Sequence, residues 1–356
     1  MTAIPEQLST ASTKTPPERS ARPEWRDVVA QYQGSDAWRA SGQMATTLLP
    51  LAAVFWLMYL SLALPYVVTL LLALPAAGLL VRTFIIMHDC SHGSFFRSRR
   101  ANDVVGWLTG VLTLTAFTDW RHGHALHHAS SGDLDRRGNG DVDTLTVREY
   151  LSRSRWDRWK YRMFRNPFVL FGLGPIHFMI TNRIPPKGVP LSDRRTSGVW
   201  LTNAAIVALV VGMSLWIGWR AVFLVYFPPM YIAAASGIWL FYVQHQFEDT
   251  YWQEHGDWDY ATAAIRGASY FKLPGILRWF TGSIGLHHVH HLGPRIPNYR
   301  LKQCHDENTL FHAVTVLTMA QSVKTLRLTL WDEERERLIG FRDLRSIAPL
   351  PTASAS

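Results

Sequence analysis

Three sets of histidines are spaced so that each set would lie on one face of a helix. They are His88 and His92, then His124, His127 and His128, and finally His287, His290 and His291. Side chains three or four residues apart meet on the same side of a helix. Imidazole is a good ligand for divalent iron, zinc, copper and nickel, and no thiolate cluster competes with it in this chain. The spacing therefore predicts a metal site with mainly nitrogen ligands.

Eight clustered histidines are too many for one ion in an ordinary site, whereas two ions could use them all. His245 is a ninth candidate, because a histidine at the end of an apolar block is a functional candidate by default. Metal-bound imidazoles usually donate their second N–H to a carboxylate or carbonyl. Asp89, Asp119 and Glu248 are close enough in sequence to serve, and His288 is expected beside the ligands rather than among them.

Long apolar blocks must position these residues. The chain has 356 residues, 48% of them hydrophobic, and its uncharged stretches are long enough for helices that cross a bilayer. We predict four spans, near 45–63, 66–87, 199–217 and 221–244, with a break at Pro65. Two shorter apolar runs, Val104–Phe117 and Phe168–Ile180, are predicted to be interfacial or re-entrant. A soluble protein rarely buries two pairs of uncharged helices of this length.

The basic residues indicate how the spans are oriented. All 36 Lys and Arg residues except Arg82 and Arg220 lie in the leader, in 85–198 or in 246–356. The positive-inside rule then places both termini and both polar regions in the cytoplasm. The fold class predicted is an all-α integral membrane protein, with four transmembrane helices and a cytoplasmic helical cap that carries the histidines.

The remaining composition sets the domain organisation. Residues 1–40 are predicted to be a disordered cytoplasmic leader, 41–345 a single membrane domain and 346–356 a flexible tail. The net charge of +9 comes without a nucleic-acid motif, so no nucleic-acid partner is predicted. Cys90 and Cys304 are the only cysteines, which does not suggest a disulfide framework.

The histidine motifs resemble the three histidine boxes of the membrane fatty acid desaturases. They read His-Asp-Cys-Ser-His at 88–92, His-x-x-His-His at 124–128 and His-x-x-His-His at 287–291. The flanking sequences are similar to those of bacterial acyl-lipid desaturases, for example Gly-Ser-Phe-Phe at 93–96 and His-Leu-Gly-Pro-Arg at 291–295. The similarity runs from about residue 40 to about residue 342.

The resemblance implies a bacterial inner-membrane enzyme that introduces a cis double bond into acyl chains, with two iron ions as cofactor and O2 as co-substrate. The ligand set that it implies is His88, His92, His124, His127, His128, His245, His287, His290 and His291. The substrate would be an acyl lipid in the membrane, and the electrons would come from a separate donor such as ferredoxin or flavodoxin. Some animal relatives use an asparagine one turn before the fourth-helix histidine to contact the metal through water. Phe241 stands at that position here, so this contact should differ.

Two alternatives stay open. A fatty acyl hydroxylase or alkane monooxygenase of the same superfamily would share the histidine boxes. A metal-binding membrane transporter would usually place ionisable groups at the middle of the bilayer, whereas these histidines lie at one edge.

Overall fold

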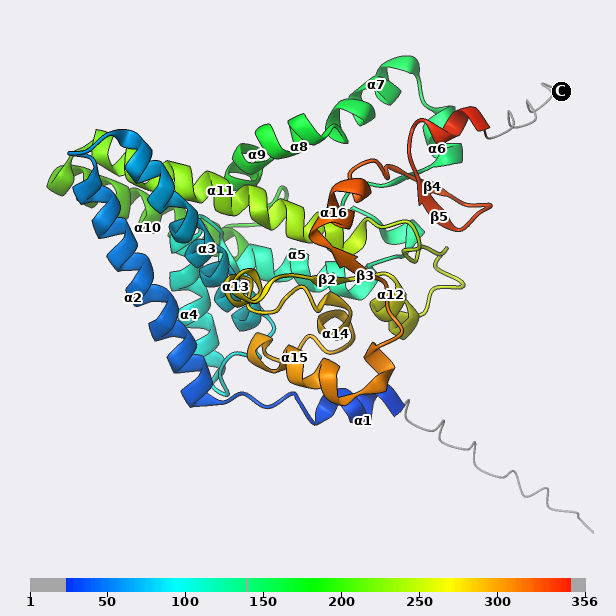
Figure 1. Ribbon diagram of the computed structural model, residues 1–356, viewed down its shortest axis with the longest axis horizontal. Coiled ribbons are helices and arrows are strands. Elements are labelled where there is room, and N and C mark those ends of the chain that lie inside the picture. The colour runs from blue at the N-terminus through cyan, green and yellow to red at the C-terminus, as the bar shows by residue number, and fades with distance from the viewer. Residues whose placement is uncertain (1–23, 139, 347–356) are drawn as a thin grey trace, which may run out of the picture.

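The computed structural model describes residues 24–138 and 140–346, which fold mainly into helices (Figure 1). The α-helices are α1 (Glu24–Ala30), α2 (Ala37–Ser61), α3 (Tyr66–Ser91), α4 (Arg99–Leu112), α5 (Phe117–Ser130), α6 (Val147–Ser152), α7 (Arg155–Phe164), α8 (Pro167–Gly172), α9 (Gly174–Thr181), α10 (Arg194–Ile217), α11 (Trp219–His245), α12 (Tyr260–Arg266), α13 (Gly275–Phe280), α14 (His287–Leu292), α15 (Asn298–Glu307) and α16 (Met319–Thr325). Short 3-10 turns are η1 (Leu134–Arg136), η2 (Thr309–Phe311) and η3 (Asp343–Ser346). The strands are β1 (Leu145–Thr146), β2 (Tyr270–Lys272), β3 (Val316–Thr318), β4 (Leu330–Asp332) and β5 (Arg337–Ile339).

Within the described residues, four helices are long and apolar enough to cross a membrane: α2, α3, α10 and α11. They form two hairpins at the left of Figure 1, and they confirm the four predicted spans. Three of them extend beyond the predicted ranges at their polar ends: α2 begins at Ala37, α3 continues to Ser91 and α10 begins at Arg194. The extension of α3 carries the chain from the apolar region to the histidine sites, because it includes His88.

The two hairpin turns lie where the sequence places them. Pro65 directly precedes α3, and α10 passes into α11 through Gly218, which has a φ of 85° that glycine adopts without strain. Pro50 and Pro75 lie inside α2 and α3, and such prolines are tolerated in membrane helices because neighbouring groups satisfy the freed carbonyls.

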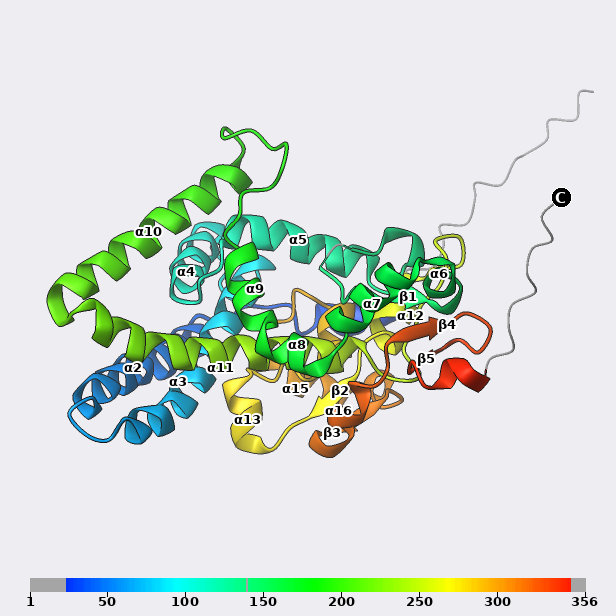
Figure 2. The same ribbon diagram turned by 90° about the horizontal axis from the view of Figure 1, so that it is seen from above.

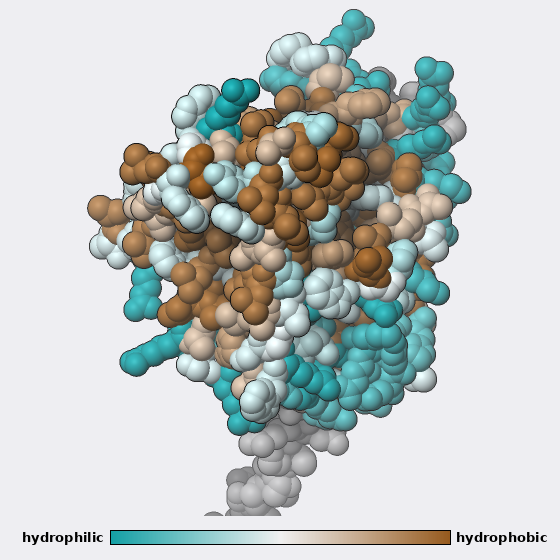
Figure 3. All heavy atoms as spheres, turned by 60° about the vertical axis from the view of Figure 1, so that its left-hand side comes forward, coloured by the Kyte–Doolittle hydropathy of each residue, from teal (hydrophilic) through white to brown (hydrophobic). Residues whose placement is uncertain are grey.

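The outer faces of the hairpins expose apolar side chains that a soluble protein would bury. Leu49, Leu71 and Leu215 are 70%, 61% and 85% exposed. Figure 3 shows this side of the molecule, where apolar side chains cover a broad area and hydrophilic ones lie at its margins. Exposed apolar surface on this scale indicates contact with lipid rather than water, so the chain is a membrane protein.

Part of the predicted disordered leader is ordered. The range 1–40 includes α1 and the first turn of α2. Val29 is buried against the core near α14, and the Tyr32 hydroxyl donates to Glu307 at 2.7 Å. Asp36 caps α2 by accepting from the N–H groups of Trp38 and Arg39. These long-range contacts order the segment. Residues 1–23, and all of the predicted tail at 346–356 except its first residue, lie outside the described residues.

The cap consists of the helices and strands that follow each hairpin, and Figure 2 shows them spread beside α11. One sheet has the strand order β1-β4-β5, with β1 parallel and β5 antiparallel to β4. The other pairs β2 and β3 in parallel. Arg165 is buried and donates to the Gln246 side chain and to the Leu328 carbonyl oxygen. It thereby holds the three-stranded sheet against the end of α11.

Candidate metal centre

Four helices, α3, α5, α11 and α14, bring the predicted histidines together. His88 lies in the last turn of α3 and His92 directly follows that helix. His245 is the last residue of α11. The cap helices α5 and α14 supply the other six. Two of the donors are membrane-length helices, so the centre lies where the apolar bundle meets the cap.

The nine histidines form two groups in the described structure. The first histidine group consists of His88, His92, His124, His128 and His290. The second histidine group consists of His127, His245, His287 and His291. Within each group, one nitrogen from every residue lies within 4.8 Å of the others. Successive histidines of the motifs in α5 and α14 belong to different groups, so each of these two helices contributes ligands to both groups.

The nitrogens that face one another are close. In the first group, Nε2 of His124 lies 3.0 Å from that of His92 and 3.2 Å from that of His128. In the second, Nε2 of His287 lies 2.9 Å from that of His245 and 3.2 Å from that of His291. The Nε2 atom of His127 is buried without a hydrogen-bond partner. A cation bound in the second group would satisfy that orphaned atom, so these residues fit a metal ion. The first group offers a similar set of nitrogens that face one another at close distance.

Burial keeps these rings in the state that metals require. Desolvation lowers the pKa of His124, His128, His290 and His291 well below the usual histidine value, and the neighbouring histidines lower it further. The same causes lower the pKa of His287. Neutral imidazole has a free nitrogen lone pair, which protonated imidazole lacks. The groups are therefore poised to bind divalent cations at neutral pH.

Three contacts orient the rings from outside. Nδ1 of His88 faces Oδ1 of Asp89 at 3.1 Å, and Asp89 also accepts from the Asn298 backbone and side-chain amides at 2.6 and 2.8 Å. Nδ1 of His245 faces the Gly267 carbonyl oxygen at 3.2 Å. Nδ1 of His127 faces Oδ1 of Asp141 at 2.6 Å. Each contact leaves the Nε2 atom of the histidine to face its group.

Sequence reasoning missed Asp141. It lies 13 positions after His128 in a loop, so no helical spacing relates it to the histidines. The signal was Gly140, whose φ of 80° permits a tight turn. A Cβ atom on Gly140 would lie 3.4 Å from the Cβ of His127, so the loop passes directly over that histidine. A turn glycine followed by aspartate, soon after a histidine box, is the pattern that could have revealed it.

The other predicted neighbours are placed differently. Asp119 accepts from Arg195 on α10, and Glu248 is exposed and paired with Arg337. Across 24–138 and 140–346, neither carboxylate forms a hydrogen bond or ion pair with a histidine of the two groups. His288 is fully buried, and its Nε2 faces Nδ1 of His305 at 3.2 Å rather than either group.

Aromatic rings border both groups. Trp120 stacks on His124 with ring centroids 4.4 Å apart. Phe241 lies one turn before His245, and its ring centroid is 5.2 Å from that of His127 and 5.0 Å from that of His245. These rings place an apolar wall directly beside the nitrogen ligands.

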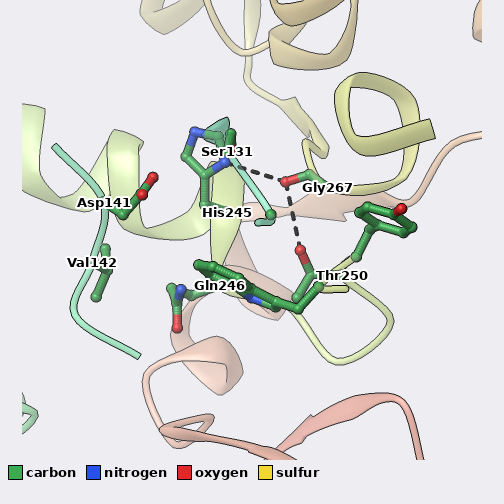
Figure 4. A pocket seen from close by; sticks show the side chains of 10 residues that line it. Ser131, Asp141, Val142, His245, Gln246, Thr250 and Gly267 are labelled. Atoms are coloured by element: carbon green, nitrogen blue, oxygen red, sulfur yellow. Dashed lines mark hydrogen bonds between the residues drawn. The ribbon is translucent and has the colours of Figure 1, made fainter. Parts of the chain in front are cut away.

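Two cavities flank the centre. A small polar pocket lies beside His245, with Asp141 and Val142 on one side and Thr250 and Gly267 on the other (Figure 4). A larger groove of about 720 Å³ opens beside His92. The arginines that line this groove are Arg97, Arg99, Arg121 and Arg295. Asp103 also lines it and pairs with Arg121 at 2.7 Å, so the groove is basic overall.

Comparison with known proteins gives a consistent result. The family model described as fatty acid desaturase matches residues 61–314. A protein of Bacillus subtilis named fatty acid desaturase is 46% identical over 320 residues, which cover 90% of each chain. Two Synechocystis proteins are more distant. An sn-1 acyl-lipid omega-3 desaturase (ferredoxin) is 25% identical, covering 62% of this chain and 61% of its own. An sn-1 oleoyl-lipid 12-desaturase is 26% identical, covering 64% of each.

Proposed function

This chain belongs to the fatty acid desaturase family, and we propose that it uses O2 and two iron ions to introduce a cis double bond into the acyl chains of membrane lipids. The observation that carries the proposal is the pair of buried histidine groups at the ends of membrane-length helices. The two Synechocystis relatives named as acyl-lipid or oleoyl-lipid desaturases support a lipid-linked substrate. We assign this activity to one domain, 41–345.

In this proposal the nine histidines hold the metal, five in the first group and four in the second. Bound iron supplies the oxidising power, drawn from O2, that no side chain can provide for attack on an unactivated methylene. Asp89, Asp141 and the Gly267 carbonyl group fix the tautomers of His88, His127 and His245, so that Nε2 of each ring carries a lone pair toward the metal.

Trp120 and Phe241 are proposed to border the reacting part of the acyl chain. Both rings contact ligand histidines, and Phe241 lies on the membrane side of His245 along α11. Apolar walls exclude stray water and restrict the acyl chain to a few orientations, and both effects favour reaction at one carbon–carbon bond.

We propose a multi-pass protein of the bacterial inner membrane, with both termini and the cap in the cytoplasm. The distribution of Lys and Arg supports this orientation, because only Arg220 adjoins the turn between α10 and α11. A cysteine introduced at Arg220 should react with a membrane-impermeant reagent on intact cells, because this orientation places it outside the cytoplasm. The label should be specific for that position, because Cys90 and Cys304 are buried. Labelling only after lysis would show that the protein has the opposite orientation.

The electron donor is proposed to be an acidic protein such as ferredoxin or flavodoxin. The basic groove beside His92 supports this choice, because opposite charge accelerates encounter and the groove reaches a ligand of the first histidine group. Reduction by a ferredoxin, followed by stopped-flow spectroscopy, should slow as ionic strength rises and should slow in Arg97→Gln/Arg99→Gln. A rate independent of salt would count against electrostatic docking.

The function is tested by expressing the chain in a host and analysing total fatty acids by gas chromatography–mass spectrometry, with dimethyl disulfide adducts to locate new double bonds. The wild-type chain should yield an unsaturated acid that His127→Ala and His290→Ala do not. His122→Ala is the matched control for His127→Ala, because His122 is an exposed histidine of the same helix and lies outside both groups. Hydroxylated products instead would assign the chain to the hydroxylase branch, and full activity of His127→Ala would overturn the metal assignment.

A further inference from the structure

Helix α7 carries a pair of tryptophans on the side that faces away from the protein. Trp156 and Trp159 are 60% and 49% exposed, and their rings stack with centroids 4.7 Å apart and an interplanar angle of 7°. On the opposite side of the helix, Tyr161 is buried and its hydroxyl donates to the Thr329 carbonyl oxygen at 2.6 Å. The inner face therefore holds α7 to the cap, and the tryptophan pair has no role in that packing.

Basic residues flank the tryptophan pair. At about 100° per residue, Trp159, Met163 and Trp156 form an outward stripe, with Arg155 on one side and Lys160 on the other. Both basic residues are exposed. An apolar stripe containing tryptophan between basic residues is typical of helices that lie in the interface of a bilayer.

The apolar surface continues from α7 along α8 and α9. Phe168, Leu173 and Ile180 are 90%, 63% and 52% exposed. In Figure 1, α9, α8 and α7 form one arm that leads from α11 to α6. The part of the arm next to α11 is fixed to the bundle, because the Tyr231 hydroxyl of α11 donates to the Gly172 carbonyl oxygen of α8 at 2.9 Å. The arm thus packs against a membrane-length helix, which favours lipid over a soluble protein as the occupant of its exposed face.

We propose that this arm, α7 to α9, lies in the membrane interface and binds anionic phospholipids. Trp156, Trp159 and Phe168 enter the boundary between head groups and acyl chains, where tryptophan side chains concentrate. Arg155 and Lys160 flank the same stripe, and lipid phosphates attract basic side chains near a membrane surface. Lys160 pairs with Asp157 at 3.1 Å, and because both side chains are about half exposed, it can exchange that partner for a phosphate. The proposal rests on the membrane location of the chain and is independent of the reaction proposed above.

The location of the arm is tested with a fluorophore attached at Lys160→Cys. Selective labelling is feasible because Cys90 and Cys304 are buried. In the full-length protein in lipid nanodiscs, the emission should shift to shorter wavelength than in the same fluorophore at Lys324→Cys, an exposed cap position. Lipids brominated in their acyl chains should quench the first label and not the second. Equal, water-like emission from both labels would overturn the interfacial placement.

The preference for anionic lipid is tested with spin-labelled phosphatidylglycerol and phosphatidylcholine, whose association with the reconstituted protein is measured by electron paramagnetic resonance. Arg155→Gln/Lys160→Gln should reduce the preference for phosphatidylglycerol roughly fivefold per basic residue removed. Lys324→Gln/Arg342→Gln, which removes the same charge from exposed cap positions, should leave it unchanged. Equal loss in both variants would show a general charge effect and overturn the assignment to the arm. Binding of an acidic protein to the arm, with the fluorophore still accessible to water, would identify a protein partner instead.

Discussion

Replacement of Asp141 should weaken metal binding in the second histidine group. The Nδ1–H group of His127 donates to Oδ1 of Asp141 at 2.6 Å, and both side chains are nearly inaccessible, at 1% and 6% exposure. Asp141→Ala leaves that N–H without its partner. Asp141→Asn retains a carbonyl oxygen that can still accept the hydrogen bond but removes the negative charge that strengthens His127 as a ligand.

The size of the effect follows from this contact. A buried hydrogen bond to a charged group contributes about 1.5–3 kcal/mol, and loss of a carboxylate behind a metal-bound histidine typically weakens metal affinity about 10- to 100-fold. We therefore expect Asp141→Ala to bind metal about 10- to 100-fold more weakly at one of two sites, and Asp141→Asn to lie between it and the wild-type protein. The assay is competition with a chelator of known affinity, with metal per chain measured by mass spectrometry.

Asp119→Asn is the matched control. Asp119 was also predicted to contact the ligands, but it pairs with Arg195, and both side chains are roughly a quarter exposed, at 26% and 30%. Exposed ion pairs contribute about 0–1 kcal/mol, so metal affinity should be unchanged. Two tightly bound ions in Asp141→Ala would refute the reasoning, and equal weakening in both variants would show that charge near the centre, rather than orientation of His127, governs affinity.

Three further predictions concern stability. A Cβ atom on Gly198 of α10 would press on Thr118 of α5, so Gly198→Ala should destabilise the protein by about 1–3 kcal/mol in thermal unfolding, and Thr118→Ala should restore part of the loss. A lack of rescue would contradict this contact. Arg137 holds the pKa of the Glu149 carboxyl below its usual value, so the ionised pair should stabilise the protein at neutral pH and lose that effect as pH falls below about 4.5. Glu149→Gln should be less stable at pH 7 and should show a smaller drop on acidification; an identical drop would be inconsistent. Finally, chelation should lower the melting temperature and added Fe(II) should restore it, whereas an unchanged melting temperature would mean that metal adds nothing to stability.

Residues related by helical spacing were predictable from the sequence. An i, i+3, i+4 pattern fixes which side chains share a face, and an uncharged stretch of membrane length fixes where a helix must run. His245 could be added to the other eight because it ends such a stretch. The division into two groups was not predictable, because it depends on how α5 and α14 cross.

Asp89 faces His88 as predicted. The other two predicted carboxylate neighbours, Asp119 and Glu248, do not contact the ligands, because helix geometry overrides closeness in sequence. Asp119 lies five residues before His124 and so points about 140° away from it around α5. Glu248 would share the face of His245 if α11 continued, but the helix ends at His245 and the chain turns Glu248 to the surface. Asp141 acts across a loop, and loop paths are set by tertiary packing rather than by periodicity.

The origin of the ligands has a consequence for biogenesis. Four of the five residues in the first histidine group lie before residue 130, so they are synthesised with the first membrane hairpin and the helix that follows it. Three of the four residues in the second group come from α11 and α14, at 245 or later. A growing chain could therefore capture one ion before the second hairpin emerges from the ribosome, and the second site would form only after that hairpin has entered the membrane. Metal supply during translation, and not only after it, would then determine how much of the protein matures.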